Sequence, residues 1–138
     1  MNRGILTALR RLTVDRRGTS ALEFSFIALP LIVLLVAIVE FGRAFWVRNL
    51  MQFAVEEAGR YAMVNTSATT TAVANVASAK LTGYGLTIKS LTVNATTSTA
   101  SGINYMSVTA QYQFSFATHL LPISTLTLSS QSKVPLTL

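Results

Sequence analysis

The sequence of 138 residues contains no cysteine, and its acidic residues are few and unevenly placed. Without cysteine, disulfides, thiolate metal sites and cysteine nucleophiles are all excluded. Only five acids occur, and the last of them is Glu57. Residues 65–138 therefore hold no carboxylate, which excludes paired-acid catalysis, carboxylate-bound calcium and a Ser-His-Asp triad within that part of the chain.

Histidine is almost as scarce, since His119 is the only one. A single imidazole cannot form a typical zinc site, which takes several protein ligands. These shortages predict a protein that is not an enzyme and that has no catalytic residues, metal, cofactor or small-molecule substrate. A serine–lysine nucleophile stays open, although nothing in the sequence points to one.

Basic residues exceed acidic ones, and the excess is concentrated at the amino end. Residues 1–18 hold five arginines and one aspartate, a net charge of +4, while residues 19–138 hold six basic residues and four acids, a net charge of +2. Arginines in front of an apolar stretch retain that end of a chain in the cytoplasm. A nucleic-acid-binding domain would instead carry a basic face interleaved with aromatic residues. The charge pattern therefore favours the lipid bilayer as a partner over nucleic acid.

The most prominent feature is a charge-free run of 16 residues from Phe24 to Val39. Continued to Gly42, it makes a helix long enough, at about 1.5 Å per residue, to cross about 30 Å of hydrocarbon. Pro30 lies inside the run and predicts a kink there, because both flanks stay apolar and the helix can continue. We expect a basic leader at residues 1–18, a transmembrane helix at 19–42 and an extracytoplasmic domain at 43–138.

Beyond Gly42, apolar residues recur at three- and four-residue steps, which is typical of an amphipathic helix. This stripe comprises Ala44, Val47, Met51, Ala54, Val55, Ala58, Tyr61 and Ala62. The pattern predicts one unbroken helix from about residue 20 to about residue 64, with Glu56 and Arg60 as an ion pair four residues apart. A second, short helix is expected at about residues 71–81.

Three strands are predicted in the remainder, at residues 86–93, 106–116 and 126–138. The second is the clearest, because apolar and polar residues alternate along it, whereas the first is irregular, as a bulge would make it. Loops at 94–104 and 117–124 would join them into an antiparallel meander. One apolar sheet face then needs a cover, so the predicted fold class is α+β, with the long helix packed on a small three-stranded sheet.

A distinct motif, Arg16-Arg17-Gly18-Thr19-Ser20-Ala21-Leu22-Glu23-Phe24, stands in front of the apolar run. Inserting an ionised acid into the membrane as part of a spanning helix costs about 2.5 to 3.5 kcal/mol of free energy on insertion scales. We therefore expect Glu23 to have a function that offsets this cost. A peptidase that cuts after Gly18 needs an extended, unobstructed backbone, and glycine lacks the Cβ that would block it. Arg16 and Arg17 would hold that bond on the cytoplasmic side. Cleavage there would leave Thr19 as a positively charged amino terminus.

The resemblance to a known family rests on residues along this helix: Gly18, Ala21, Glu23, Phe24, Pro30, Glu40, Phe41 and Gly42. Over about residues 16–64 the chain resembles the TadE-like pseudopilins, minor subunits of the tight-adherence (Tad) type IV pilus. The resemblance implies a single-pass protein of the bacterial inner membrane that a prepilin peptidase cuts. It also implies partners among other pilin subunits and the Tad inner-membrane assembly platform, and a role in pilus biogenesis and adhesion.

The resemblance further implies that Glu23, with Phe24 beside it, takes part in subunit assembly by pairing with the free amino terminus of a neighbouring subunit. Glu40 and Gly42 match the family too, although an acid at the far membrane boundary is also what any helix emerging into water would show. Glu23 itself is alternatively a helix cap, worth about 0.3 to 1 kcal/mol in a first turn, or a side chain that reaches the headgroups.

Two alternatives for the whole chain stay open. One is a single-pass membrane protein that keeps its leader and enters no pilus. The other is a secreted binding module that ordinary signal peptidase releases at Gly42-Arg43-Ala44. Against this release, the apolar stripe continues straight through that point, so cleavage would separate the stripe from its support.

Overall fold

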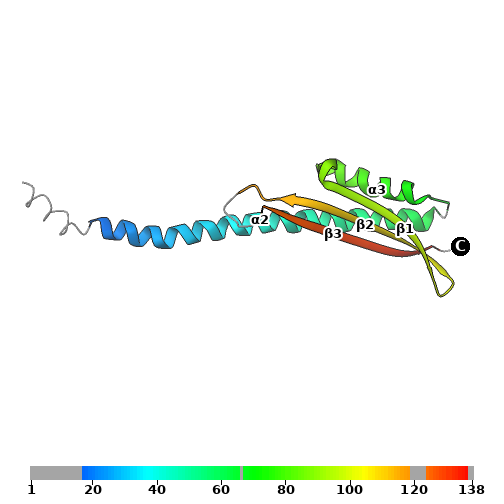
Figure 1. Ribbon diagram of the computed structural model, residues 1–138, viewed down its shortest axis with the longest axis horizontal. Coiled ribbons are helices and arrows are strands. Elements are labelled where there is room, and N and C mark those ends of the chain that lie inside the picture. The colour runs from blue at the N-terminus through cyan, green and yellow to red at the C-terminus, as the bar shows by residue number, and fades with distance from the viewer. Residues whose placement is uncertain (1–16, 66, 119–123, 137–138) are drawn as a thin grey trace, which may run out of the picture. The chain divides into compact units, whose positions relative to one another are not determined.

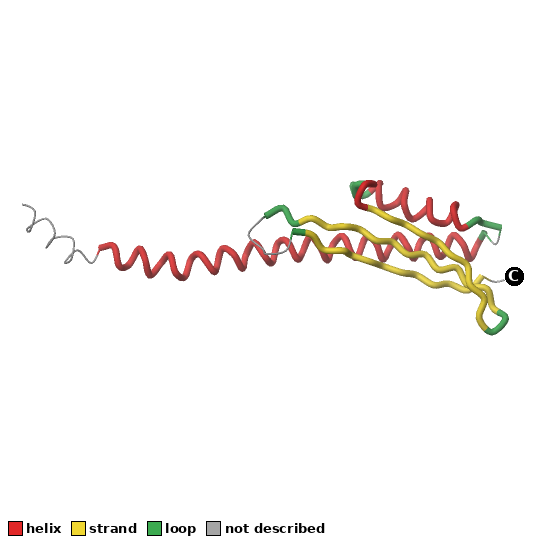
Figure 2. Tube along the Cα trace, in the orientation of Figure 1, coloured by secondary structure: helices red, strands yellow, loops and turns green. Residues whose placement is uncertain are grey.

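The computed structural model describes residues 17–65, 67–118 and 124–136. The elements are helices α2 (Arg17–Val64) and α3 (Thr70–Gly83), a 3-10 turn η1 (Ile88–Ser90), and strands β1 (Leu91–Ala100), β2 (Ile103–Ser115) and β3 (Thr125–Leu136) (Figures 1 and 2). The predicted α+β class is confirmed. The chain divides into two compact units at Ile38 and Val39, and each is described by itself.

Helix α2 continues through Pro30 and through the end of the apolar run without interruption. The predicted helix over about 20–64 is confirmed, and it begins slightly earlier, at Arg17. Adding residues at this end changes the free energy little, because the first N–H groups of any helix lack an intrahelical acceptor. A kink at Pro30 stays a prediction.

Helix α3 confirms the second predicted helix and is slightly longer than expected. It begins where the side chain of Thr69 accepts a hydrogen bond from the backbone N–H of Ala72, at 3.2 Å. Such an N-cap satisfies one of the unpaired donors of the first turn. The buried face of α3 consists of Val73, Ala77 and Leu81.

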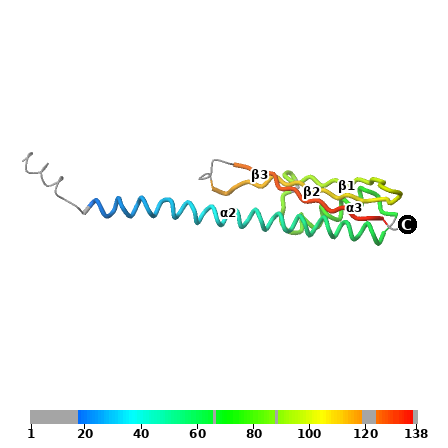
Figure 3. Tube along the Cα trace, turned by 90° about the horizontal axis from the view of Figure 1, so that it is seen from below, coloured from blue at the N-terminus to red at the C-terminus, as the bar shows by residue number. Residues whose placement is uncertain are grey.

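The three strands form an antiparallel meander in the order β1-β2-β3, as expected. The register aligns Val93 with Ala110 and Ala110 with Ser130, so these residues share one sheet face. Figure 3 shows the strands on one side and the carboxyl-terminal half of α2 with α3 on the other. The stripe of α2 lies in the core between these layers, except for Tyr61, which is 38% exposed.

The first predicted strand is wrong in position. Residues 88–90 form a 3-10 turn, which accounts for the irregular apolar spacing, and β1 runs from Leu91 to Ala100. The expected loop at 94–104 is instead the distal half of the β1–β2 hairpin. Its two turn residues, Ser101 and Gly102, have φ of 53° and 79°, a conformation that suits the twist of a tight hairpin.

The physical reason is that the distal half of β1 is exposed on both faces. It carries no apolar alternation to mark it as a strand. Its threonines have β-branched side chains that favour extended backbone, and each residue pairs with one on β2. Cross-strand pairing, which a single segment of sequence does not reveal, therefore makes it a strand.

The predicted ion pair between Glu56 and Arg60 is also wrong. Among the described residues, the Glu56 carboxylate accepts a hydrogen bond from Gln52 Nε2 at 2.8 Å. The ion pairs that α2 makes within the described residues involve Glu40 and Glu57.

Candidate functional site

The amino-terminal unit is a helical segment whose large apolar side chains are exposed. Between Leu22 and Ile38, the leucine, isoleucine and phenylalanine side chains have exposed fractions between 54% and 80%, while Val33 and Val36 are partly covered. The helix is long and apolar enough to cross a membrane. Ser25 donates its hydroxyl to the Ala21 carbonyl at 2.8 Å, which satisfies a polar group within the run. This surface is compatible with a single-pass membrane anchor.

Gly18, Thr19 and Glu23 lie within the first two turns of α2, and all three are exposed. Thr19 and Glu23 are four residues apart, so they share one face of the helix, a turn from each other. A Cβ added to Gly18 would meet no atom within 4 Å. The side chains of Thr19 and Glu23 and the backbone at Gly18 are therefore accessible to another protein.

Gly18 and Thr19 are both helical, whereas a peptidase that cuts between them needs an extended backbone. A peptidase would have to unwind the first turn. That turn is the least costly part of a helix to open, since its N–H groups lack intrahelical acceptors and helix ends fray. Arg17 is the first residue of α2. Arg16, the rest of the leader and His119 lie outside the described residues.

Phe24 and Pro30 are exposed on the same segment, and Phe24 is 72% exposed. Neither contributes to the core of the folded domain, which begins at Ala44 along the chain. Their exposure agrees with a role on a surface that lipid or another helix covers.

Glu40 differs from the other acids because it is buried, with only 4% of its surface exposed. Its Oε2 accepts a hydrogen bond from the Arg43 guanidinium at 2.8 Å. The same oxygen accepts one from the backbone N–H of Ala117, just beyond β2, at 3.3 Å. Glu40 therefore ties the helix to the segment that follows β2, and the interpretation of Glu40 as an ordinary acid at a water boundary does not describe its surroundings.

Aromatic side chains surround this contact. Phe41 meets Phe116 edge to face with ring centroids 6.2 Å apart, and Phe116 meets Phe114 in the same way at 5.4 Å. The Arg43 guanidinium lies 5.2 Å from the centre of the Phe114 ring. Such stacking and cation–π contacts strengthen a partly desolvated ion pair. Sequence reasoning missed this cluster, although one signal was present: Glu40 stands four residues before Ala44, in line with the buried stripe.

Comparison with known protein families now bears on this helix. Residues 18–60 match the model of the TadE-like protein family. Over this helix the chain is similar to TadE-like proteins. The match begins at Gly18 and includes Glu23, Glu40 and Gly42. The comparisons with curated proteins and with solved structures found no match.

The TadE-like match covers less than half of the chain and lies within α2. TadE-like proteins are structural components associated with the Tad pilus, and their apolar amino-terminal helix fits the exposed surface between Leu22 and Ile38. The match relates α2 to a family of pilus components. It agrees with the expectation of a structural protein.

The helix of the TadE-like match is joined to α3 by a second ion pair. Lys80 Nζ donates to Glu57 Oε1 at 2.8 Å, with both side chains 38% exposed. The hydrogen bond to Glu57 raises the pKa of Lys80 above its ordinary value. Lys80 Nζ also lies 5.8 Å from the centre of the Phe53 ring. The pair fixes α3 beside α2 at the surface.

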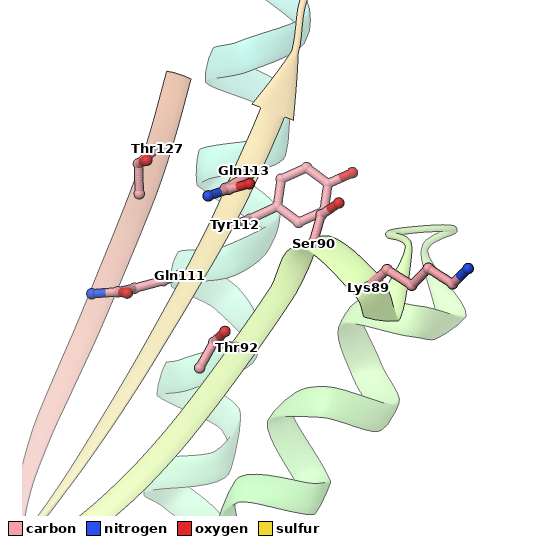
Figure 4. Close-up of a pocket in the computed structure, with 7 residues that line it drawn as sticks. All are labelled: Lys89, Ser90, Thr92, Gln111, Tyr112, Gln113 and Thr127. Atoms are coloured by element: carbon pink, nitrogen blue, oxygen red, sulfur yellow. The ribbon is translucent and has the colours of Figure 1, made fainter. Parts of the chain in front are cut away.

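The outward face of the sheet is polar and nearly uncharged. Figure 4 shows a hollow there, lined by Lys89, Ser90, Thr92, Gln111, Tyr112, Gln113 and Thr127. Lys89 is the only charged residue in this lining, so the hollow offers no acid–base pair. Among the described residues, no group of three or more His, Cys, Asp or Glu side chains could hold a metal ion.

Proposed function

We propose that this chain is a minor subunit of a Tad-type pilus that is made as a prepilin, cut after Gly18 and assembled through α2. The observation that carries the proposal is the TadE-like match, which begins at Gly18 on a helix whose apolar side chains are exposed. In the membrane, lipid covers this surface. In the assembled state, helices of neighbouring subunits replace the lipid.

The proposed docking group is Glu23. Cleavage after Gly18 creates a positively charged amino group at Thr19. The amino group of one subunit would pair with Glu23 of its neighbour. Glu23 is exposed on the second turn of α2. Opposite charges attract far more strongly in an apolar environment than in water. The cost of holding a carboxylate near lipid then becomes a driving force for assembly.

In this proposal the basic leader stays in the cytoplasm, where the prepilin peptidase and the assembly platform act. The domain after Gly42 lies on the other side of the membrane, and its polar sheet face is available for contacts in the pilus or for adhesion. The arginines before the helix support this orientation, because positive flanks are retained on the cytoplasmic side.

The amino terminus of the mature protein tests the cleavage. Intact mass and amino-terminal sequencing should give Thr19 after coexpression with the prepilin peptidase. Met1 would indicate a membrane protein that keeps its leader, and Phe45 would indicate release by signal peptidase. Either result would refute the proposal.

Gly18→Leu should abolish this cleavage, since a large side chain would obstruct the peptidase. The helix itself has room for the side chain, because no atom lies within 4 Å of the added Cβ. Gly42→Leu is the matched control, because its Cβ also meets nothing within 4 Å. It should be cut normally. Equal processing of both variants would contradict the role of Gly18.

Glu23→Ala tests the docking role separately. It should leave cleavage intact and strongly reduce the amount of the protein that copurifies with other pilus subunits. Glu23→Gln should have a similar effect, because it removes the charge and keeps the shape. Ser25→Ala, a nearby exposed position on the same helix, should assemble normally. Normal assembly of Glu23→Ala would overturn the docking role and leave cleavage unaffected.

A further inference from the structure

Four exposed aromatic side chains lie where the folded domain begins along α2 or in the turn after α3, and together with Arg43 they are called the collar. Phe41, Phe45 and Trp46 come from α2, and Tyr84 comes from the turn after α3. Their exposed fractions are 42%, 62%, 56% and 41%. Trp46, Tyr84 and Arg43 line one hollow of about 250 Å³, together with Leu86, Tyr112 and Phe114. Residues distant in sequence thus present aromatic rings and one guanidinium on the same part of the domain.

The length of the apolar run indicates what covers this collar. The 16 residues from Phe24 to Val39 span only about 24 Å at about 1.5 Å per residue, whereas the hydrocarbon of a bilayer is about 30 Å thick. The charge-free run alone is therefore short by about four residues, and the helix must supply them from its flanks. Mismatch of this kind is relieved by thinning the bilayer or by drawing flanking residues into it.

The two ends of the run are not equivalent for this purpose. At the amino end, the exposed carboxylate of Glu23 opposes deeper burial in lipid. At the other end, Glu40 is buried in the protein and accepts hydrogen bonds from Arg43 and from the Ala117 backbone. Its charge is already paired, so lipid can reach the exposed side of the helix past residue 40 without meeting a bare carboxylate.

We propose that this collar sits among the phospholipid headgroups of the bilayer that α2 crosses, so that the base of the domain rests on the membrane surface. The inference depends on the membrane insertion in the proposed function. The headgroup layer is about 5 to 8 Å thick on each side, or about four residues of helix. With the hydrocarbon edge moved to about residue 41, level with the contact between Glu40 and Ala117, this layer reaches to about residue 45, and Trp46 lies at its outer edge.

The composition of the collar suits this environment. Tryptophan and tyrosine are enriched at the membrane interface because one part of the ring system is apolar and another part forms hydrogen bonds. Arg43 is exposed over about half of its side chain and can reach lipid phosphates while it holds Glu40. Tyr84 adds a contact from outside α2, so the collar fixes the base of the domain as well as the helix.

Trp46 is the only tryptophan in the chain, which gives a direct test. The full chain is reconstituted into vesicles of phosphatidylcholine with a minor share of phosphatidylglycerol. One set carries a nitroxide on the headgroup, and another carries it deep in the acyl chain. We expect blue-shifted emission that the headgroup nitroxide quenches several-fold more strongly than the deep one.

Two moved tryptophans provide matched controls in a Trp46→Phe background. Phe53→Trp lies seven residues farther along α2, about 10 Å away, and should escape quenching by either label. Tyr84→Trp should be quenched by the headgroup label, although it lies on another element. Quenching at residue 46 without quenching at Tyr84→Trp would overturn the inference that the domain base rests on the membrane.

Resistance of the vesicle-bound protein to alkaline carbonate extraction is measured in the same samples. An inserted chain whose Trp46 is not quenched by lipid overturns the collar and leaves the anchor intact, whereas a chain that fails to insert refutes both. Raising the ratio of lipid to protein tests whether a second copy of the chain, and not lipid, covers Trp46. If emission shifts to the red as copies separate, a second copy covered Trp46, and the lipid assignment is wrong.

Discussion

At the scale of single residues, Glu40 is the most consequential side chain of the folded domain. It is buried, and one of its oxygens serves both Arg43 and the backbone of Ala117. Removing a buried acceptor leaves its donor unpaired, which costs about 1 to 3 kcal/mol. Arg43 can turn to solvent because half of its side chain is exposed, whereas the Ala117 N–H depends on Glu40.

Glu40→Ala should therefore lower the free energy of unfolding of the domain by about 1 to 3 kcal/mol. Glu40→Gln should cost less, because its carbonyl oxygen can still accept from Ala117. Denaturant unfolding in detergent, followed by Trp46 fluorescence, measures both. Glu56→Ala is the control: Glu56 is exposed and bonded to Gln52, so its loss should change stability by less than about 0.5 kcal/mol. Equal losses of stability at Glu40 and Glu56 would show that the hydrogen bond from Ala117 to Glu40 does not stabilise the domain.

At the scale of elements, the packing of α2 on the sheet depends on small residues at the closest approach. A Cβ at Gly59 would lie 3.0 Å from Val134 Cγ1 and 3.2 Å from Ser132 Oγ on β3. Alanines at positions 54, 58 and 62 are buried around it. Residues 54 and 58–60 fall within the TadE-like match. The matched segment therefore contains two features: the apolar run and the small residues that pack against β3.

Gly59→Leu should destabilise the domain by about 1 to 3 kcal/mol, because extra side-chain volume in a packed layer forces the helix and β3 apart. Gly83→Leu is the matched control, since its Cβ would meet nothing within 4 Å, and it should be nearly neutral. Combining Gly59→Leu with Val134→Ala should recover part of the loss, because the nearest atom is removed. Additive effects in this double-mutant cycle would show that the two residues are not coupled.

The elements also show which parts of the fold a single sequence can predict. The helices and β2 have a clear period of apolar residues, and they are where the sequence predicts them to within a few residues. The distal half of β1 is exposed on both faces and is a strand only through its pairing with β2. The role of Glu40 depends on Ala117, 77 residues away. Features of this kind come from tertiary contacts, which local periodicity does not encode.

At the scale of the whole molecule, the buried residues of the core all belong to the unit that begins at Val39. Among the described residues before Val39, no apolar side chain belongs to that core. A fragment of residues 39–138 keeps Glu40, the stripe of α2, α3 and the sheet. It should therefore fold in water without the apolar helical segment.

Thermal unfolding of this fragment should be a single cooperative transition with an enthalpy of about 60 to 80 kcal/mol, the range for a domain of about 100 residues. Calorimetry and far-ultraviolet circular dichroism measure it, and agreement between the calorimetric and van't Hoff enthalpies establishes cooperativity. A fragment of residues 50–138 is the control. It lacks Glu40, Ala44 and Val47, which are buried in the domain, so it should melt at a lower temperature or not fold. If the longer fragment unfolds gradually, the domain depends on the apolar helical segment before it, and the division at residue 39 has no energetic meaning.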